Sequence, residues 1–436
     1  MAFTFRGGVH PKGNKSFTRE CPFEIAPQPE EVFLPLSQHI GKPAECIVSA
    51  GDRVLKGQMV AKAQEGLSVP VYSPVSGEVA GIVMRPTLFS TATPHIHIKN
   101  DKQEEEVRLP ALENPTKEEI VERIREAGIV GMGGAGFPTA AKVAATVETL
   151  LMNVAECEPY ITCDHRLLLE YPAEFLEGAE LLRIACGADR IVIGVENNKP
   201  EVIEKLAEFH VPVIKKRTEI NANAVCVLPL KTKYPQGGEK QMVYAVTGKE
   251  IPDGKLPSAL GVMVMNAHTA FAVYEAVKCG KPLYERYMTL SGSAAQRPCN
   301  VLAKTGTPYS FFAELCGASE DTRMVISGGP MMGFCAVSGD VSTTKTTGSL
   351  LFFDKKEAVL DNVGACIGCG RCVSVCPMRL MPVMIDQYAF TGNLKEAERY
   401  GAMSCMECGC CSFACPAKRP LLQSIRAAKK KIRESK

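Results

Sequence analysis

Short apolar segments alternate with polar and turn residues over positions 36–100, as in CIVSAGDRVLKGQMVAKA and VPVYSPVSGEVAGIV. Alternation with a period of two places apolar side chains on one face of a strand, and the Gly, Ser and Pro residues between the runs end each strand. The pattern predicts a small all-β domain over residues 36–105, preceded by an N-terminal extension of residues 1–35.

An acidic, Pro-containing stretch, NDKQEEEVRLPALENPTKEE, follows the β domain. Its end predicts a helix start, with Thr116 as the N-cap and Glu119 three residues later. From residue 112 to 285, strand-like runs such as LLMNVA and RIVIGVE alternate with helical runs such as PEVIEKLAEF, which is typical of an α/β domain. Residues 286–345 return to short strands and predict a β-rich module, and residues 355–436 form a last unit.

Composition narrows the functional classes. The 436 residues give a formal net charge of +2, so no global field favours nucleic acid as a partner. No apolar run approaches the roughly 18 residues that cross a bilayer, and the start MAFTFRGGVHPKGNK lacks the apolar stretch of a secretory signal. We therefore expect a chain without a transmembrane segment of its own.

The cysteines are unevenly distributed: of 19 in the chain, nine lie between Cys366 and Cys415. ACIGCGRCVSVCP and SCMECGCCSFACP both have the spacing C-x2-C-x2-C-x3-C-P. Three cysteines on one loop reach three corners of an iron–sulfur cube, and the fourth, followed by proline, ligates the other cube. The predicted ligands are Cys366, Cys369, Cys372 and Cys415 for cluster one, and Cys405, Cys408, Cys411 and Cys376 for cluster two.

The alternative for the cysteines is a pair of zinc sites, which need only two C-x2-C elements each and have no use for the x3-C-P arm. Two copies of the full spacing favour iron–sulfur clusters. Cys410 lies beside Cys411 and is a bystander by register. Two linked clusters form a one-electron relay, so another part of the chain must supply or accept the electrons.

The stretch GIVGMGGAGFPTAAK, residues 128–142, has Gly131, Gly133 and Gly136 at the G-x-G-x-x-G spacing. A dinucleotide-binding fingerprint needs a strand before the glycines. Here the preceding TKEEIVERIREAG has apolar residues at helical spacing, so the fingerprint lacks its structural context. Pro138 suits the first turn of a helix that TAAKVAATVETL continues, so the loop amides and that helix predict an anion site, with Lys142 within reach of a phosphate or else exposed.

GMGGAGFPTAAK and NVAECEP resemble the flavin-binding motifs of the NADH-oxidising subunit of respiratory complex I, in which such a loop cradles FMN and NADH stacks on the flavin. YPQGGE and NAHT are similar to the Y-x-x-G-x-E and N-x-x-T elements of that family, and residues 286–345 to its β-grasp module. The resemblance implies that FMN and NAD(H) are bound by Gly131, Gly133, Gly134, Gly136, Phe137, Lys142, Asn153, Glu156, Glu158, Gly237, Glu239, Asn266 and Thr269.

Several of these positions have two interpretations. Phe137 is either a stacking surface for nicotinamide or a packing residue. Glu156 and Glu158 either bond hydroxyls of the flavin or the nicotinamide ribose, or are solvated loop carboxylates. The chain has Ala155 and Gly238 where the family has acidic residues, so the resemblance is more specific for the flavin than for nicotinamide.

The order of FRGGVHP, PLSQHIGKPAE, a barrel-sandwich hybrid, a Rossmann-like α/β flavin domain, a β-grasp module and an α-helical double-cluster ferredoxin domain resembles the C subunits of Rnf complexes. Those complexes are membrane-bound ferredoxin:NAD oxidoreductases that pump Na+ or H+. The resemblance implies a peripheral subunit on the cytoplasmic side of the membrane. It would exchange hydride with NAD(H) at FMN and pass electrons through two [4Fe-4S] clusters to partner subunits and, ultimately, ferredoxin.

Two other functions remain open: a soluble flavin and iron–sulfur reductase of the cobalamin-reductase kind, and a non-catalytic relay subunit without flavin. The barrel sandwich resembles biotinyl and lipoyl domains, but AQEGLSVPVY has no carrier lysine, which favours a structural or docking module. The basic tail AKRPLLQSIRAAKKKIRESK predicts a helix that either docks on a partner or an anionic membrane, or covers the ferredoxin domain.

Overall fold

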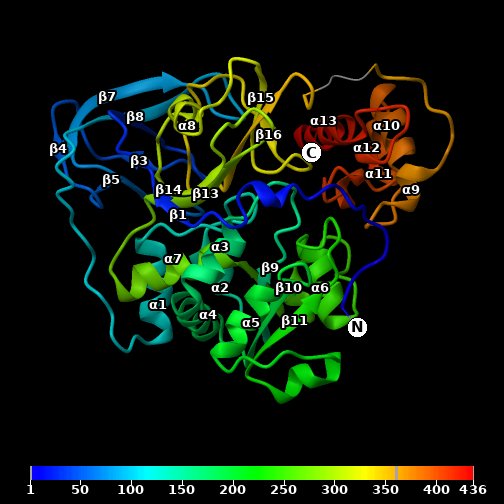
Figure 1. Ribbon diagram of the computed structural model, residues 1–436, viewed down its shortest axis with the longest axis horizontal. Helices are drawn as coiled ribbons and strands as arrows, with labels where there is room; N and C mark the ends of the chain where they lie inside the picture. Colours follow the sequence, from blue (N-terminus) through cyan, green and yellow to red (C-terminus); the bar gives the residue numbers. More distant parts are fainter. Residues whose placement is uncertain (1, 359–361, 436) are drawn as a thin grey trace.

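The computed structural model describes residues 2–358 and 362–435, which form four β-sheets and a helical C-terminal unit (Figure 1). Two of the sheets make up the N-terminal barrel sandwich, one forms the core of the α/β domain, and the fourth lies between the barrel sandwich and the C-terminal helices. None of the helices described is long and apolar enough to cross a membrane.

The barrel sandwich has a four-stranded sheet in the order β2-β8-β7-β4 and a three-stranded sheet in the order β3-β5-β6. Its strands are β2 (Glu31–Pro35), β3 (Glu45–Cys46), β4 (Arg53–Val54), β5 (Met59–Lys62), β6 (Val71–Tyr72), β7 (Gly77–Arg85) and β8 (Thr93–Asn100). Val32 and Leu34 of β2 are fully buried in this core. The domain therefore begins before residue 36, because the predicted extension contains its first long strand.

The α/β domain is built on a parallel sheet in the order β11-β10-β9-β12. Its strands are β9 (Thr149–Val154), β10 (Arg190–Glu196), β11 (Val225–Leu230) and β12 (Val262–Asn266). Its helices are α1 (Lys117–Glu126), α2 (Thr139–Val143), α3 (Cys163–Glu170), α4 (Pro172–Cys186), α5 (Pro200–Glu208), α6 (Glu239–Thr247) and α7 (Ala267–Lys278). Strand order reverses between β9 and β12, and ligands of open α/β sheets bind at the carboxyl ends of the strands beside such a point.

Helix α1 has the predicted capping box: the Glu119 amide donates to Thr116 Oγ1, and the Thr116 amide to Glu119 Oε2. Helix α2 is shorter than predicted and ends at Val143, because Thr149 already belongs to the buried strand β9. Asp164 lies in the first turn of α3.

The fourth sheet has the order β1-β14-β13-β17-β15-β16. Its strands are β1 (Phe23–Ile25), β13 (Glu285–Ser291), β14 (Cys299–Lys304), β15 (Thr322–Ser327), β16 (Phe334–Cys335) and β17 (Ser349–Asp354), and α8 (Tyr309–Leu315) packs on it. The sheet extends past the predicted end at residue 345 and takes β1 from the extension. Both differences arise because β1 and β17 pair with strands distant from them in sequence.

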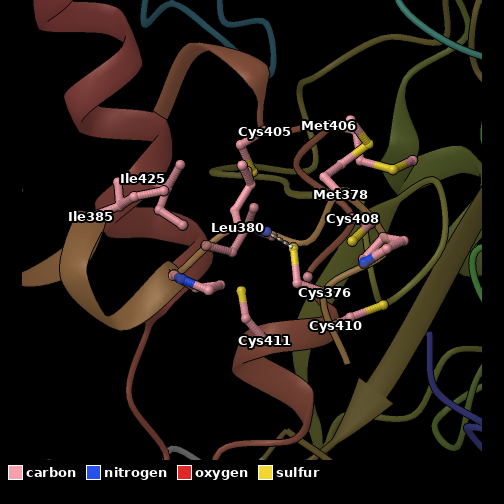
Figure 2. A pocket seen from close by; sticks show the side chains of 14 residues that line it. Cys376, Met378, Leu380, Ile385, Cys405, Met406, Cys408, Cys410, Cys411 and Ile425 are labelled. Carbon is pink, nitrogen blue, oxygen red and sulfur yellow. Dashed lines mark hydrogen bonds between the residues drawn. The ribbon is translucent and has the colours of Figure 1, made fainter. Parts of the chain in front are cut away.

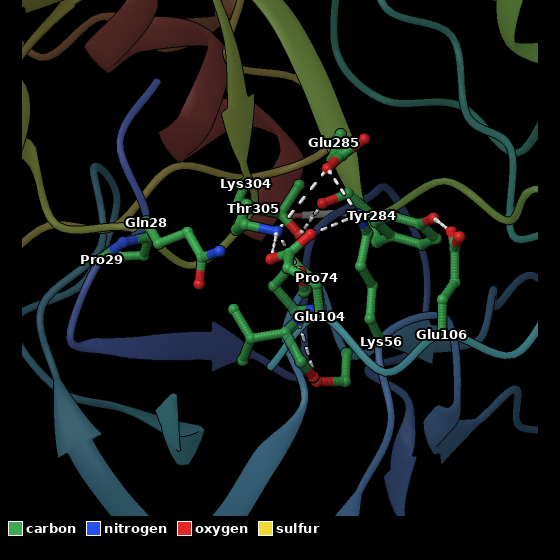
Figure 3. A network of polar contacts seen from close by, with 12 residues as sticks. Gln28, Pro29, Lys56, Pro74, Glu104, Glu106, Tyr284, Glu285, Lys304 and Thr305 are labelled. Atoms are coloured by element: carbon green, nitrogen blue, oxygen red, sulfur yellow. Dashed lines mark hydrogen bonds and ion pairs between the residues drawn. The ribbon is translucent and has the colours of Figure 1, made fainter. Parts of the chain in front are cut away.

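Charged side chains join the barrel sandwich to this sheet (Figure 3). Glu104 forms ion pairs with Lys56 and Lys304, both at 2.7 Å, and Lys304 also donates to the Pro74 carbonyl at 2.9 Å. The Glu285 carboxylate lies 3.9 Å from both amines. Because most of these groups are shielded from water, the network fixes the orientation of the two units.

The C-terminal unit is helical. It contains α9 (Arg371–Ser374), α10 (Pro382–Phe390), α11 (Leu394–Arg399), α12 (Cys410–Phe413) and α13 (Leu421–Glu434). The unit also contains the short 3-10 turn Ala402–Ser404, and the other 3-10 turns of the described chain are Lys15–Phe17, Arg217–Ala222 and Pro257–Leu260. The apolar face of α13, which includes Leu421, Ile425 and Ile432, is buried, and α13 packs on α10. The interpretation that the basic tail covers the cysteine-containing unit is therefore confirmed.

Candidate flavin and iron–sulfur sites

The glycine loop between α1 and α2 has two positions where a side chain does not fit. A Cβ at Gly136, whose φ is +71°, would lie 2.8 Å from Thr346 Cγ2. A Cβ at Gly133 would lie 3.0 Å from Asn266 Cβ. Gly134, by contrast, has no atom within 4 Å of that position, so the loop is packed on one side and open on the other.

The open side presents unpaired backbone donors. The amide of Gly131 donates to the Phe137 carbonyl at 2.8 Å, and the amide of Met132 to Thr269 Oγ1 at 3.2 Å. The amides of residues 133–137 donate to no protein acceptor in the part of the chain that the structure describes. Consecutive free N–H groups form a concavity for an anion. The loop therefore fits a phosphate through its amides, since α2 with five residues is too short to contribute an appreciable dipole.

Lys142, predicted to reach the phosphate, has other partners in the structure. Its Nζ donates to the Val264 carbonyl at 2.7 Å and lies 3.1 Å from Glu239 Oε1. The lysine side chain is about one-third exposed. Two predicted cofactor-binding residues are thus brought together as an ion pair.

The predicted motifs meet at the carboxyl edge of the sheet. Asn153, near the end of β9, donates from Nδ2 to the Gly237 carbonyl at 2.8 Å and accepts from the Ala155 amide at 3.1 Å. Asn266, at the end of β12, caps α7 by accepting from the His268 amide and donates to Asp164 Oδ2 at 3.0 Å. These residues stand at the point where the strand order reverses.

Glu156 is 7% exposed, and its Oε1 accepts from the Asp164 amide at 2.8 Å. Its Oε2 has no hydrogen-bond partner among the described residues but lies 3.7 Å from Lys15 Nζ. Burial raises the pKa of this carboxyl, and the charge of Lys15 opposes the rise.

Glu158 accepts hydrogen bonds from the Met331 amide at 3.1 Å and the Met332 amide at 3.0 Å, and its Oε1 lies 3.3 Å from the Tyr234 hydroxyl oxygen. Burial raises the pKa of this carboxyl to about 7, and these hydrogen bonds limit the rise. The interpretation of Glu156 and Glu158 as solvated carboxylates is therefore wrong, because other parts of the chain enclose both.

Phe137 is 40% exposed at the rim of the glycine loop. This exposure leaves much of its surface available to a ligand. The ring is therefore not enclosed by the core of the chain.

The four cysteines predicted for cluster two line one pocket (Figure 2). Cys408 and Cys411 are buried, whereas Cys376 and Cys405 are half-buried. Cys376 comes from the first motif and the other three from the second, so the two motifs contribute to a single site. Cys410 also borders the pocket; its thiol lies beside that of Cys408 and 4.0 Å from the Tyr234 carbonyl.

The ligands predicted for cluster one lie on the outer side of the unit. Cys366 and Cys369 are exposed, and Cys372 and Cys415 are half-buried. The pKa of Cys372 is raised by burial and further by the charges of Cys415 and Cys366, which places the three thiols near one another. For Cys376 the nearby thiol is instead Cys408. Each fourth cysteine therefore approaches the other motif.

The distances between the cysteine sulfurs distinguish zinc sites from iron–sulfur cubes. Zn–S bonds of about 2.3 Å hold tetrahedral sulfurs about 3.8 Å apart. A site for one metal ion needs at least three ligand atoms close together. Among the described residues, Cys163, Asp164 and His268 form the one group whose ligand atoms all lie within 4.8 Å of one another. The eight motif cysteines are spread more widely, as expected when each thiolate binds a different iron of a cube.

Three residues at these sites were not predicted from the sequence. Lys15 contacts Glu156 from the extension, Tyr234 donates its hydroxyl proton to the Cys408 carbonyl at 2.8 Å, and Lys429 donates to the Cys405 carbonyl at 2.7 Å. Tyr234 belongs to the YPQGGE motif, which could have been used to predict it as a site residue. Lys15 and Lys429 belong to no recognisable sequence motif. Only the tertiary structure shows that they contact the sites.

Family models match three segments: an RnfC barrel sandwich hybrid domain over residues 3–103, a Nuo51 FMN-binding domain over 124–275 and a 4Fe-4S dicluster domain over 358–416. The third match includes residues 359–361, which lie outside the described residues. Fold and sites thus define a multidomain protein that joins an FMN-binding α/β domain to a double-cluster iron–sulfur domain.

Full-length relatives specify the family. The chain is 39% identical to the C subunit of the proton-translocating ferredoxin:NAD(+) oxidoreductase complex of Clostridium ljungdahlii, over 99% of this chain and 95% of the relative. It is 39% identical to the Na(+)-translocating counterpart of Acetobacterium woodii, over 98% and 97%, and 40% identical to the C subunit of the ion-translocating oxidoreductase complex of Rhodobacter capsulatus, over 100% and 84%. The chain belongs to this family of C subunits.

Proposed function

We propose that this chain is the NAD(H)-converting subunit of a membrane-bound, Rnf-type ferredoxin:NAD oxidoreductase complex. The observation that carries the proposal is the row of free amides at residues 133–137, which lies at the reversal point of the sheet. The same domain contacts cluster two through the hydrogen bond from Tyr234 to the Cys408 carbonyl. A two-electron site and a one-electron relay thus adjoin in one chain.

FMN, when bound, supplies the exchange between a two-electron hydride donor and one-electron clusters. The free amides of residues 133–137 bind its phosphate, while Lys142 is paired with Glu239. Asn266 packs against Gly133 while Thr269 accepts from the Met132 amide, so both fix the loop. Phe137 offers its exposed ring to nicotinamide. The α/β domain is in this view Rossmann-like and the sheet around β13 is a β-grasp module.

The cysteines hold two [4Fe-4S] clusters with the crosswise ligation given above. Partner subunits take or supply the electrons, couple them to ferredoxin, and translocate Na+ or H+. The chain itself is peripheral, on the cytoplasmic side of the membrane. The barrel sandwich acts as a structural or docking module.

The test is anaerobic reconstitution followed by flavin analysis and titration with NADH, monitored optically and by electron paramagnetic resonance. We expect bound FMN and reduction of both clusters by NADH. Gly133→Val places bulk against Asn266 and should abolish FMN binding while the iron content stays unchanged. Gly13→Ala, where a Cβ meets nothing closer than 3.9 Å, is the matched control.

Two other outcomes identify the competing functions. A chain that binds no FMN and whose clusters NADH does not reduce would be a non-catalytic relay. A chain that reduces cobalamin and is recovered without membrane partners would be a soluble reductase.

A further inference from the structure

The N-terminal residues 3–15, here called the strap, run between the α/β domain and the cysteine-containing unit (Figure 1). At its start, the Phe3 amide donates to the Pro229 carbonyl at 3.0 Å, and the Lys231 amide donates to the Phe3 carbonyl at 2.8 Å. Val9 and Tyr234 then exchange two backbone hydrogen bonds, at 2.8 and 3.0 Å. The strap is thus paired with the end of β11 and with the segment that follows it.

Two glycines in FRGGVHP lie at the boundary of the two units: Gly7 contacts the cysteine-containing unit, and Gly8 contacts both. The Gly8 amide donates to the Val375 carbonyl at 2.8 Å. A Cβ at Gly7 would lie 2.8 Å from the Cys376 carbonyl oxygen, and a Cβ at Gly8 would lie 2.5 Å from that of Tyr234. Both residues have positive φ, +77° and +80°, which side chains disfavour. The gap between the two units at this point therefore accommodates backbone alone.

The far end of the strap holds the segment with the two glutamates. The Gly13 carbonyl accepts from the Tyr160 amide at 2.7 Å. Lys15 donates to the carbonyls of Glu158, at 3.0 Å, and Ile161, and its amine lies 3.7 Å from Glu156. One continuous segment therefore contacts both flavin-domain motifs, at Tyr234 and at Glu158, and the backbone of a predicted cluster-two ligand.

We propose that the strap is a positioning element for electron transfer, in which Gly7 and Gly8 set the separation between the flavin site and cluster two. The proposal rests on the proposed function. The step it governs is the passage of one electron from reduced flavin to the cluster, with no bond made or broken. Its rate falls steeply with distance, so a small outward shift of the loop at Cys376 slows it while leaving each cofactor's own site intact.

The experiment compares Gly7→Ala with Gly13→Ala in the full, reconstituted chain. Stopped-flow spectroscopy follows the reduction of flavin by NADH and of the clusters as separate phases. We expect Gly7→Ala to reduce flavin at the wild-type rate and to slow cluster reduction at least about tenfold, with unchanged cluster potentials, because the added Cβ pushes on the Cys376 backbone. Gly13→Ala should match wild type in both phases. Unchanged cluster reduction in Gly7→Ala overturns the proposal.

Hydrogen exchange of the protein without cofactors gives an independent readout. We expect faster exchange in Gly7→Ala of the Gly8, Val9 and Tyr234 amides, which join the strap to the two units, and exchange as in wild type within β9 and β10. Slow exchange at these three amides in the variant contradicts the proposal.

If Gly7→Ala does not fold, Gly8→Ala takes its place. If neither folds, exchange of the Gly8 and Val9 amides in wild type decides: protection comparable to strand β11 supports a docked strap, and exchange at the rate of a free peptide overturns it. Failure of the proposed function appears differently, as absent flavin reduction in wild type and Gly13→Ala alike.

Discussion

The two cysteine motifs have the same spacing but different surroundings. In the first motif, Cys366 and Cys369 are exposed, whereas in the second Cys408 and Cys411 are buried. The second motif lies against Tyr234 and Val9 of the strap, and Lys429 of α13 contacts it as well. The cysteine spacing thus determines that the motif binds iron–sulfur clusters, and the surrounding residues determine how accessible each cluster is to solvent.

The charges near the two sites differ as well. Lys429, which is 6% exposed, donates to the Cys405 carbonyl and lies 2.6 Å from Glu407 Oε1. Near cluster one, Arg419 is paired with Asp386 at 2.7 Å. Because nearby charges and solvent exposure set cluster potentials, the two clusters are expected to have different potentials.

The largest expected effect comes from removing ligands. Cys408→Ser and Cys376→Ser should each eliminate the same paramagnetic signal and lower the iron content by about half, since in each variant cluster two loses a ligand and is not retained. Cys369→Ser and Cys415→Ser should eliminate the other signal. Iron analysis and electron paramagnetic resonance measure both effects. Loss of the same signal in Cys376→Ser and Cys369→Ser would contradict crosswise ligation.

Thiol alkylation of the cluster-free protein tests the difference in exposure. We expect Cys366 and Cys369 to react at least about tenfold faster than Cys408 and Cys411, because a buried thiol reacts only after local opening. Mass spectrometry after timed labelling with N-ethylmaleimide gives the rates. Cys335, exposed and outside both motifs, is an internal reference. Equal rates for the two motifs would show that the difference in burial is absent in solution.

Lys429→Met tests the difference in charge. Removing an amine from the backbone of Cys405 should lower the potential of cluster two by on the order of 50 mV, because the reduced cluster loses a stabilising positive charge. Cluster one should be unaffected. Lys430→Met, at an exposed neighbouring position, is the control. A redox titration in which both clusters shift equally would indicate a general structural change instead.

The smallest expected effect is a pH dependence confined to cluster two. Burial raises the pKa of Glu158 to about 7, so the carboxyl loses its proton as the pH rises through neutrality. The new negative charge disfavours the reduced cluster, so the potential of cluster two should fall by on the order of 20 mV between pH 6 and 8. Glu158→Gln should remove this slope. A slope that persists in the variant would assign it to another group.

Most of the predictions made from the sequence rest on local patterns. The cysteine spacing and the capping box of Thr116 and Glu119 involve residues a few positions apart, so the sequence specifies them directly. The length of α2 was not predictable in this way, because β9 is drawn into the sheet by distant strands. The extension likewise supplies β1 and β2 to two sheets through partners far along the chain.

The candidate site shows the same distinction between local sequence patterns and long-range contacts. The sequence by itself determined the chemistry, because backbone amides of a glycine loop bind anions and thiolates at this spacing bind iron. The tertiary structure alone decided which groups are enclosed: Lys15 and the amides of Met331 and Met332 reach Glu156 and Glu158 across more than 140 positions. It also decided that FRGGVHP fills the gap between two units. Burial and long-range contacts depend on the packed chain as a whole, and no local pattern encodes them.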